Sequence, residues 1–383
     1  MTRLAKTRKI VFWAIVNVAL LVLILALVEG LSSLALFVQR VARTPVMAER
    51  RHTQYDPLLG WVNLPNVDIK NMYGRGIYLR TNGQAFRNNA DFNVTVPANK
   101  VRIICSGDSF TFGYGVDNDH TWCQLLAAKD SRLEAVNMGQ GGYGVDQAYL
   151  WYKRDGVRLA HDIHLFAFIS ADFRRAAGRS FFGYGKPLLK LENDQLVVTN
   201  VPVPKRAFVV PWLTQNRAAI NSLKTSELLR LLATGGERIT EPSDDGPAGG
   251  EPAGVESTGG RTLQEAVAGK ILAELAQLNR ANNSVLVLVY LPVQNPGPEA
   301  PKWREYVHRA AEQLGVLLVD LTDAFNGLSS EEVTSLFIQE GQLDYTNAGG
   351  HYTVSGNQRV ADILHEKLLS FPEVRKKLAG GHQ

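Results

Sequence analysis

A serine follows directly on an apolar run in the stretch CSGDSFTFG, residues 105–113. The run from Val101 to Ile104 is typical of a buried strand, and Ser109 lies where that strand would end. A serine at the exit of a strand, ahead of a helix, is how several unrelated hydrolases expose a nucleophilic hydroxyl. The pattern also fits an ordinary helix cap, because Asp and Ser are common N-cap residues. The stretch alone leaves both interpretations open.

Two later segments also carry residue types suited to acyl transfer. NMGQGGYG, residues 137–144, follows a second apolar run, and the N–H of a glycine in it could donate to an oxyanion. FISADFRR, residues 168–175, follows a third run and contains Asp172. Glycine-rich turns after strands are common, so neither segment alone indicates acyl-transfer chemistry, and only their combination does.

A histidine near the carboxyl end completes the candidate chemistry. His351 lies in GGHYTVSGNQRVADIL, residues 349–364, ahead of a turn and a helical pattern. A neutral imidazole can take the proton of a serine hydroxyl, so His351 could act as a general base for Ser109. A lone histidine is also often structural, and this alternative stays open.

Apolar runs alternate with helical patterns from residue 101 onward, which predicts a three-layer α/β sandwich with a central parallel sheet. The carboxyl ends of parallel strands meet at one edge, where open α/β folds gather their sites. The expected strands cover residues 101–105, 133–139, 163–170, 284–293 and 316–321, and the expected helices cover 120–129, 145–157, 262–280 and 301–314.

The chain begins with a segment that predicts a membrane anchor. Ile10 to Val28 holds one strongly polar residue, Asn17, and is long enough as a helix to cross a bilayer. The basic residues before it predict a cytoplasmic amino terminus, with the main domain periplasmic or extracellular and the anchor in the inner (plasma) membrane. A cleaved signal peptide is the alternative, although the apolar stretch exceeds the usual length of its core. The basic residues are Arg3, Lys6, Arg8 and Lys9.

Three parts of the chain follow from these patterns. Residues 1–40 form the cytoplasmic tip and the anchor, and residues 41–98, rich in turn residues, form a membrane-proximal extension of short strands and loops. Residues 99–370 form one α/β domain, which an insertion at about 234–260 interrupts. This insertion, composed of Gly, Pro, Ser and acidic residues, is expected to be disordered.

Composition narrows the function classes. The 383 residues are 45% hydrophobic and carry a net charge of +4, without basic clusters beyond the amino terminus, so a nucleic-acid partner is not expected. The two cysteines, Cys105 and Cys123, are expected to be buried free thiols rather than a disulfide. No motif typical of a metal site or a cofactor site is found in the sequence.

The ordered set GDSFTFG, NMGQGGYG, a strand ending in Asp172 and a late His351 resembles the SGNH/GDSL hydrolase family. The flanks YDPLLGW, TNGQAFRNN and FGYGVDNDHTW resemble its membrane-anchored bacterial branch. The resemblance covers residues 54–175, and residues 281–365 by topology and one motif. It implies the family's flavodoxin-like fold and a serine hydrolase mechanism.

The resemblance also implies roles for single residues. Ser109 matches the nucleophile, His351 the general base, and the N–H groups of Ser109 and Gly142 the oxyanion donors. Gly141 is close enough to be confused with Gly142. The residues expected to support the site are Asp108, Asn137 and Asp172.

Two positions depart from the family's pattern. Ala171 stands where the family has an oxyanion Asn, and Ala348 stands where it has the Asp three residues before the His. Losing one oxyanion donor costs roughly 10²–10³ in rate in other enzymes. The imidazole then needs another orienting group, and Asp344, Asn347 or a backbone carbonyl are the candidates.

Three functions remain in competition. The first is an extracytoplasmic esterase or deacetylase acting on an O-acylated glycan or lipid. The second is an O-acetyltransferase that modifies an exopolysaccharide together with polysaccharide-synthesis membrane proteins. The third is an inactive SGNH scaffold that binds a glycan or a membrane partner. The presence of both Ser109 and His351 favours an enzyme.

Overall fold

The computed structural model describes residues 3–43, 51–181, 184–204, 263–343 and 345–380. The chain divides into two compact units, one of residues 1–47 and 207–246 and one of residues 48–206 and 247–383. The insertion expected at about 234–260 lies outside the described residues, and so does Asp344.

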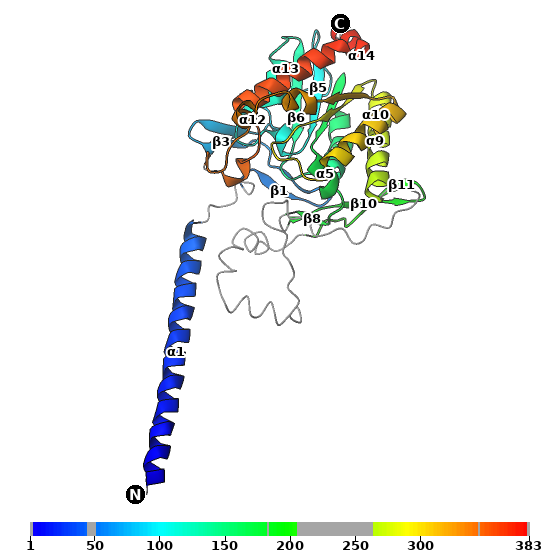
Figure 1. Ribbon diagram of the computed structural model, residues 1–383. Helices are drawn as coiled ribbons and strands as arrows, with labels where there is room; N and C mark the ends of the chain where they lie inside the picture. Colours follow the sequence, from blue (N-terminus) through cyan, green and yellow to red (C-terminus); the bar gives the residue numbers. More distant parts are fainter. Residues whose placement is uncertain (1–2, 44–50, 182–183, 205–262, 344, 381–383) are drawn as a thin grey trace. The chain divides into compact units, whose positions relative to one another are not determined.

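A parallel sheet of five strands forms the centre of the larger unit (Figure 1). Its strands lie in the order β13-β12-β7-β5-β6, and every neighbouring pair is parallel. Numbered along the chain, this is the order 2-1-3-4-5 of flavodoxin-like folds, so the predicted fold is confirmed. The strands are β5 (Val101–Gly107), β6 (Leu133–Gly139), β7 (Ile163–Phe168), β12 (Val285–Tyr290) and β13 (Leu317–Asp320).

Helices cover both faces of the sheet because its strands are apolar on both sides. In β5, Ile104 belongs to one buried cluster, whereas Ile103 and Cys105 belong to the other. Figure 1 shows α9 and α10 on the opposite side of the sheet from α13. The first cluster includes side chains of α4 (Val145–Arg154), α9 (Leu263–Ala281) and α10 (Ala300–Leu314), and the second those of α3 (Trp122–Ala127) and α13 (Val354–Ser370).

Short hairpins and helices complete this unit. The hairpins β8–β9 and β10–β11 lie where the sequence predicted no elements, whereas β1 to β4 lie in the expected extension. The hairpin strands are β1 (Thr53–Asp56), β2 (Gly60–Asn63), β3 (Asp68–Gly74), β4 (Ile77–Arg80), β8 (Ser180–Phe181), β9 (Tyr184–Gly185), β10 (Leu188–Glu192) and β11 (Gln195–Thr199). The short helices are α2 (Ser109–Phe112), η2 (Asn118–His120), η3 (Gly156–Arg158), α5 (Ser170–Arg175), α11 (Thr322–Asn326), α12 (Ser330–Leu336), η4 (Thr346–Ala348) and α14 (Pro372–Ala379).

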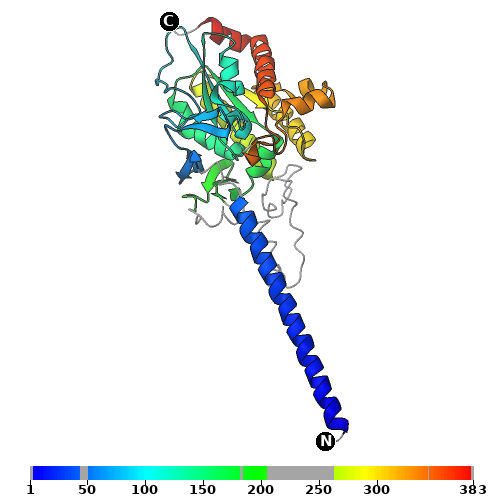
Figure 2. The ribbon, with the colours of Figure 1, turned by 90° about the vertical axis from the view of Figure 1, so that its left-hand side faces the viewer.

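A single long helix, α1 (Arg3–Arg43), forms the described part of the smaller unit (Figures 1 and 2). Its segment Arg8–Ala35 has a mean hydropathy of 3.0, so it is long and apolar enough to cross a membrane. Asn17 donates its side-chain N–H to the carbonyl of Trp13 at 2.7 Å, which satisfies that polar group within the helix.

The core of the larger unit holds two free thiols and a buried serine–histidine pair. Cys105 and Cys123 are both buried and free, as expected from the sequence. Ser106 Oγ lies 2.6 Å from His164 Nε2, and both residues are fully buried. Asn279 Nδ2 donates to His164 Nδ1 at 3.1 Å, so Nε2 carries the ring proton and donates it to Ser106. His164 is therefore in the wrong tautomer to act as a base for Ser106.

Candidate active site

The nucleophile candidate sits at the carboxyl end of β5. Asp108 is the N-cap of α2, since its Oδ1 accepts the N–H of Phe110 at 2.9 Å. Ser109 is the first residue of the helix, so the cap and the nucleophile interpretations apply to two neighbouring residues. Gly107 permits this sharp exit, because a Cβ there would lie 2.4 Å from the carbonyl oxygen of Ala167 on β7.

Ser109 Oγ lies 2.7 Å from His351 Nε2, although the two residues are 242 positions apart. His351 is held in the connection between η4 and α13, where its carbonyl accepts the N–H of Ile338 at 2.7 Å. The imidazole packs against the rings of Phe110 and Tyr114, with ring centroids 4.6 and 5.1 Å apart. The structure thus brings the two residues into the contact that a general base requires.

A backbone carbonyl orients the imidazole. His351 Nδ1 lies 3.3 Å from the carbonyl oxygen of Ala348, the residue at the position of the family's Asp. The carbonyl can only accept, so Nδ1 carries the proton and Nε2 is left to accept the proton of Ser109. This tautomer is the opposite of the one in the buried pair of Ser106 and His164.

The surroundings of His351 keep it neutral. Desolvation is the largest effect and lowers the pKa of His351 to about 4. The carboxylate of Asp108 raises this pKa and the guanidinium of Arg175 lowers it, and neither outweighs burial. At neutral pH the imidazole is therefore in the form that can take a proton.

The oxyanion donors are expected from Ser109 and Gly142. Within the described chain, no hydrogen bond is found for the amide of either residue. Gly142 has a φ of 76°, and a Cβ there would lie 2.7 Å from the ring of Phe181. Trp61 donates its indole N–H to the carbonyl of Gly141 at 2.9 Å, which fixes the turn from the other side.

Asn137 ties this turn to the nucleophile helix. Its Nδ2 donates to the carbonyl of Thr111 at 2.9 Å, and its Oδ1 accepts the N–H of Gly139 at 2.9 Å. The amide of Gln140 donates to the carbonyl of Gly107 at 3.1 Å. The side chain of Asn137 is engaged within the fold, so it positions the site and is not placed to bind a reacting group.

The segment after β7 carries an arginine, Arg175, that the sequence analysis missed. Asp172 accepts the N–H of Ile169, and Arg175 Nη1 lies 2.5 Å from Asp172, 3.0 Å from Asp108 and 3.2 Å from the carbonyl oxygen of Tyr143. Burial, with the nearby Asp108, raises the pKa of Asp172 well above its usual value. The spacing of Asp172 and Arg175, three residues apart on a helix, was the signal for their contact.

A second arginine holds the chain behind the nucleophile. Arg87, which is fully buried, donates to the carbonyls of Phe112, Gly113 and Val116 at 2.5 Å each. Its Nε donates to Asn118 Oδ1 at 3.1 Å. Arg87 belongs to the motif TNGQAFRNN of the expected extension, and its guanidinium thus binds the loop that follows α2.

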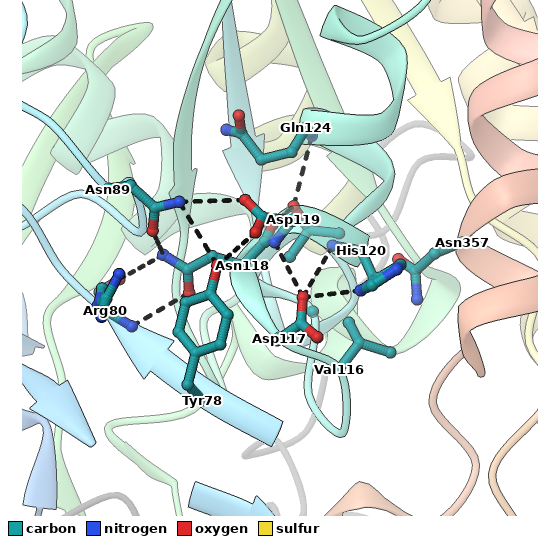
Figure 3. Close-up of polar contacts among 12 residues, drawn as sticks. Tyr78, Arg80, Asn89, Val116, Asp117, Asn118, Asp119, His120, Gln124 and Asn357 are labelled. Carbon is teal, nitrogen blue, oxygen red and sulfur yellow. Dashed lines mark hydrogen bonds and ion pairs between the residues drawn. The ribbon is translucent and has the colours of Figure 1, made fainter. Parts of the chain in front are cut away.

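Asn118 is the hub of a polar network beside this loop (Figure 3). Its Nδ2 donates to the carbonyl of Arg80 at 2.9 Å and to Asn89 Oδ1 at 3.0 Å, and its Oδ1 accepts the N–H of Arg80. Asp119 accepts from Tyr78 at 2.7 Å and from Asn89 at 3.0 Å. Among the described residues no group suited to hold a metal ion is found, and this network is explained by its internal hydrogen bonds.

A cavity of about 1010 Å³ opens beyond the ends of β7, β12 and β13. Ser170, directly ahead of Ala171, belongs to its lining. The ring of Tyr352, the residue after His351, lies with its centroid within 6.1 Å of the ring centroids of Phe325 and Phe337. Both phenylalanines also line the cavity. Ring contacts of Phe325 and Phe337 with Tyr352 therefore connect the lining of the cavity to the neighbour of His351.

No protein-family model and no curated protein matches the chain. Among solved structures, it is similar to a member of the lipolytic protein G-D-S-L family from Veillonella parvula, at 12% identity over 71% of this chain and 100% of the other, with a TM-score of 0.38. The lipase/acylhydrolase from Enterococcus faecalis matches at 12% identity over 70% and 96%, with a TM-score of 0.37. The acetyl xylan esterase AlAXEase matches at 13% identity over 70% and 99%, also with a TM-score of 0.37.

The G-D-S-L name is that of the family whose motifs this chain resembles. At TM-scores below 0.5, these likenesses establish no activity for the chain. The chemistry of the site is carried by the side chains and backbone groups described above.

Proposed function

We propose that this protein is a serine ester hydrolase that removes acyl groups from an O-acylated glycan or lipid. The observation that carries the proposal is the 2.7 Å contact between Ser109 Oγ and His351 Nε2, with the imidazole in the accepting tautomer. An inactive scaffold would not need that tautomer, because a structural pair can hold the opposite one, as Ser106 and His164 do.

The reaction would proceed through an acyl-enzyme. Ser109 Oγ attacks the ester carbonyl carbon, its proton passes to His351 Nε2, and the carbonyl electron pair becomes the oxyanion. The intermediate collapses, the alcohol leaves with the proton from His351, and an ester to Ser109 Oγ remains. Water then attacks this ester with His351 again as the base, which releases the carboxylic acid and the free serine.

Labelling with a fluorophosphonate tests the pair directly. We expect the probe to mark Ser109 in the full-length protein, and we expect His351→Ala to suppress the labelling because an unassisted hydroxyl is a poor nucleophile. Ser106 is the control serine for this labelling, since its partner His164 cannot accept its proton. The substitution of His120, which is half-exposed and pairs with Asp117, is the control for loss of a histidine elsewhere.

Hydrolysis of acetylated glycans, with Ser109→Ala as the inactive reference, tests the substrate class. Absence of both labelling and acetate release in a folded protein would leave the inactive scaffold as the function. Acyl transfer to a polysaccharide is a second candidate, favoured by the cavity beyond β7, β12 and β13, which offers room for an acceptor. A higher yield of acylated glycan than of free acid, with an acceptor glycan present, would identify the transferase.

We also propose that α1 anchors the protein in the inner membrane, with the amino terminus in the cytoplasm, the main domain outside and membrane proteins of polysaccharide synthesis as partners. The apolar segment Arg8–Ala35 and the basic residues before it support this topology. Protease added to spheroplasts should digest residues 48–383. Protection of this part until the membrane is lysed would contradict the proposed orientation.

A further inference from the structure

The loop after β7 lacks the side chain that the family uses at the oxyanion. Ala171 carries only a methyl group there, and it packs beside the buried cluster of the α13 face. One turn further along α5, Arg175 reaches back toward the nucleophile. Its side chain is 12% exposed, so its charge lies in the protein interior at the edge of the site.

Arg175 contacts the chain beyond three adjacent strands. Through Nη1 it binds Asp108 after β5, the carbonyl of Tyr143 after β6 and Asp172 after β7. Asp108 directly precedes Ser109, and Tyr143 directly follows Gly142. The guanidinium therefore bridges the two segments whose amides are the expected oxyanion donors.

Part of the guanidinium makes no hydrogen bond among the described residues. Nη1 makes all the hydrogen bonds found for this group among the described residues, while Nε is buried and without a partner there. The positive charge of Arg175 also acts electrostatically on His351 and lowers the pKa of its imidazole. A positive charge that disfavours the imidazolium favours an oxyanion at the same place.

We propose that the Arg175 guanidinium stabilises the oxyanion of the acyl-transfer reaction in place of the missing side chain at position 171. When Ser109 Oγ attacks and its proton moves to His351, negative charge develops on the former carbonyl oxygen. A fixed cation nearby lowers the energy of that state more than that of the neutral ester. This inference rests on the proposed hydrolase function.

Kinetics of three variants of the full-length protein test the proposal. Arg175→Met should lower kcat by about 10²–10³, the usual cost of a lost oxyanion donor, with a smaller change in KM. Arg175→Lys keeps the charge and should lose less. Ala171→Asn in the Arg175→Met background should recover at least about tenfold in kcat, because it restores a donor by a different route.

Arg174→Met is the matched control, since Arg174 is the exposed neighbour on the same helix and should leave kcat unchanged. A kcat of Arg175→Met within about threefold of the unmodified protein would overturn the proposal. So would a loss that neither Lys at position 175 nor Asn at position 171 relieves, because Arg175 would then act as a structural clamp alone. An unmodified protein without esterase activity or Ser109 labelling would instead refute the hydrolase function.

Discussion

His351 meets Ser109 in surroundings that disfavour the imidazolium ion. Its pKa is lowered to about 4, mainly by burial. In the proposed hydrolase mechanism the neutral form is the base, so activity should be present above this pKa and should be lost as the pH falls through it. We expect kcat/KM for an uncharged acetyl ester to be level down to about pH 5.5 and to fall tenfold per unit below about pH 4.

Rates measured from about pH 3.5 to pH 8 check this expectation. Samples returned to neutral pH after each acid incubation should regain full activity, which separates titration from unfolding. A decline centred near 6.5, the value of an ordinary histidine, would show that the imidazole is solvated in the working enzyme.

Gly142 is expected to be irreplaceable for steric reasons as well as for its backbone angle. Gly142→Ala places a methyl group 2.7 Å from the ring of Phe181, whereas Gly76 has a similar φ of 81° and open space around it. Gly76→Ala should cost about 1 kcal/mol of unfolding free energy. Gly142→Ala should cost more and should also reduce ester hydrolysis by at least tenfold.

Urea unfolding and acetate release, measured on both variants, separate the two effects. Equal losses of stability in Gly76→Ala and Gly142→Ala would mean that Phe181 moves aside easily. Retention of full activity in Gly142→Ala would remove this turn from the oxyanion site.

Among the connecting elements, the loop after α2 depends on an arginine from the preceding extension. Arg87→Met leaves the carbonyls of Phe112, Gly113 and Val116 without their buried donor. At about 1–3 kcal/mol for each unsatisfied group, we expect a loss of at least 3 kcal/mol in unfolding free energy. Calorimetry or urea unfolding measures it.

Arg80→Met is the matched control for this loss of charge. The guanidinium of Arg80 is half-exposed and pairs with Asp68 at 3.1 Å. Exposed pairs contribute about 0–1 kcal/mol, so this variant should be nearly as stable as the unmodified protein. Similar losses in the two variants would show that the buried contacts of Arg87 contribute no more than a surface pair.

The sheet could be predicted from the sequence because each central strand is a short, mostly apolar run between polar turns. β6 begins at Leu133 and ends at Gly139, the bounds that its apolar run predicted. The hairpins β8–β9 and β10–β11 could not be predicted, since their strands are two to five residues long and mostly half-buried. Such strands show neither a long apolar run nor a clear alternation.

The candidate site also contains residues that could be predicted from the sequence and groups that could not. Ser109 and His351 could be proposed because a nucleophile and a base are recognised by residue type and by their place after strands. The carbonyl of Ala348 could not, because every residue has one and only the fold selects it. Arg175 was missed because an arginine at the end of a short helix is usually solvated, and its partner Asp108 is distant in the sequence.

Buried histidines in the larger unit make the stability of the protein depend on pH. Burial lowers the pKa of His164 well below its usual value and lowers that of His161 as well. Below about pH 6.5 the unfolded chain binds protons at these residues that the folded chain does not, so stability falls as the pH falls. Each histidine contributes a slope of up to about 1.4 kcal/mol per pH unit.

Urea midpoints at about pH 7 and pH 5 measure this slope. His164→Gln should be less stable at both values but should show a shallower slope, since one titrating group is gone. An unchanged slope in His164→Gln would assign the acid sensitivity to other groups.

The contacts of Arg87 have a last consequence for how this chain can be divided. An autonomous catalytic module could be cut out at the start of β5 and fused elsewhere, but here the loop behind Ser109 receives its donors from residue 87. Asn88 reinforces the dependence, because it hydrogen-bonds to Ala135 and Asn137 of β6. The segment 51–98 and the sheet should therefore melt in one cooperative transition. They form one folding unit, and the segment is not a separable linker.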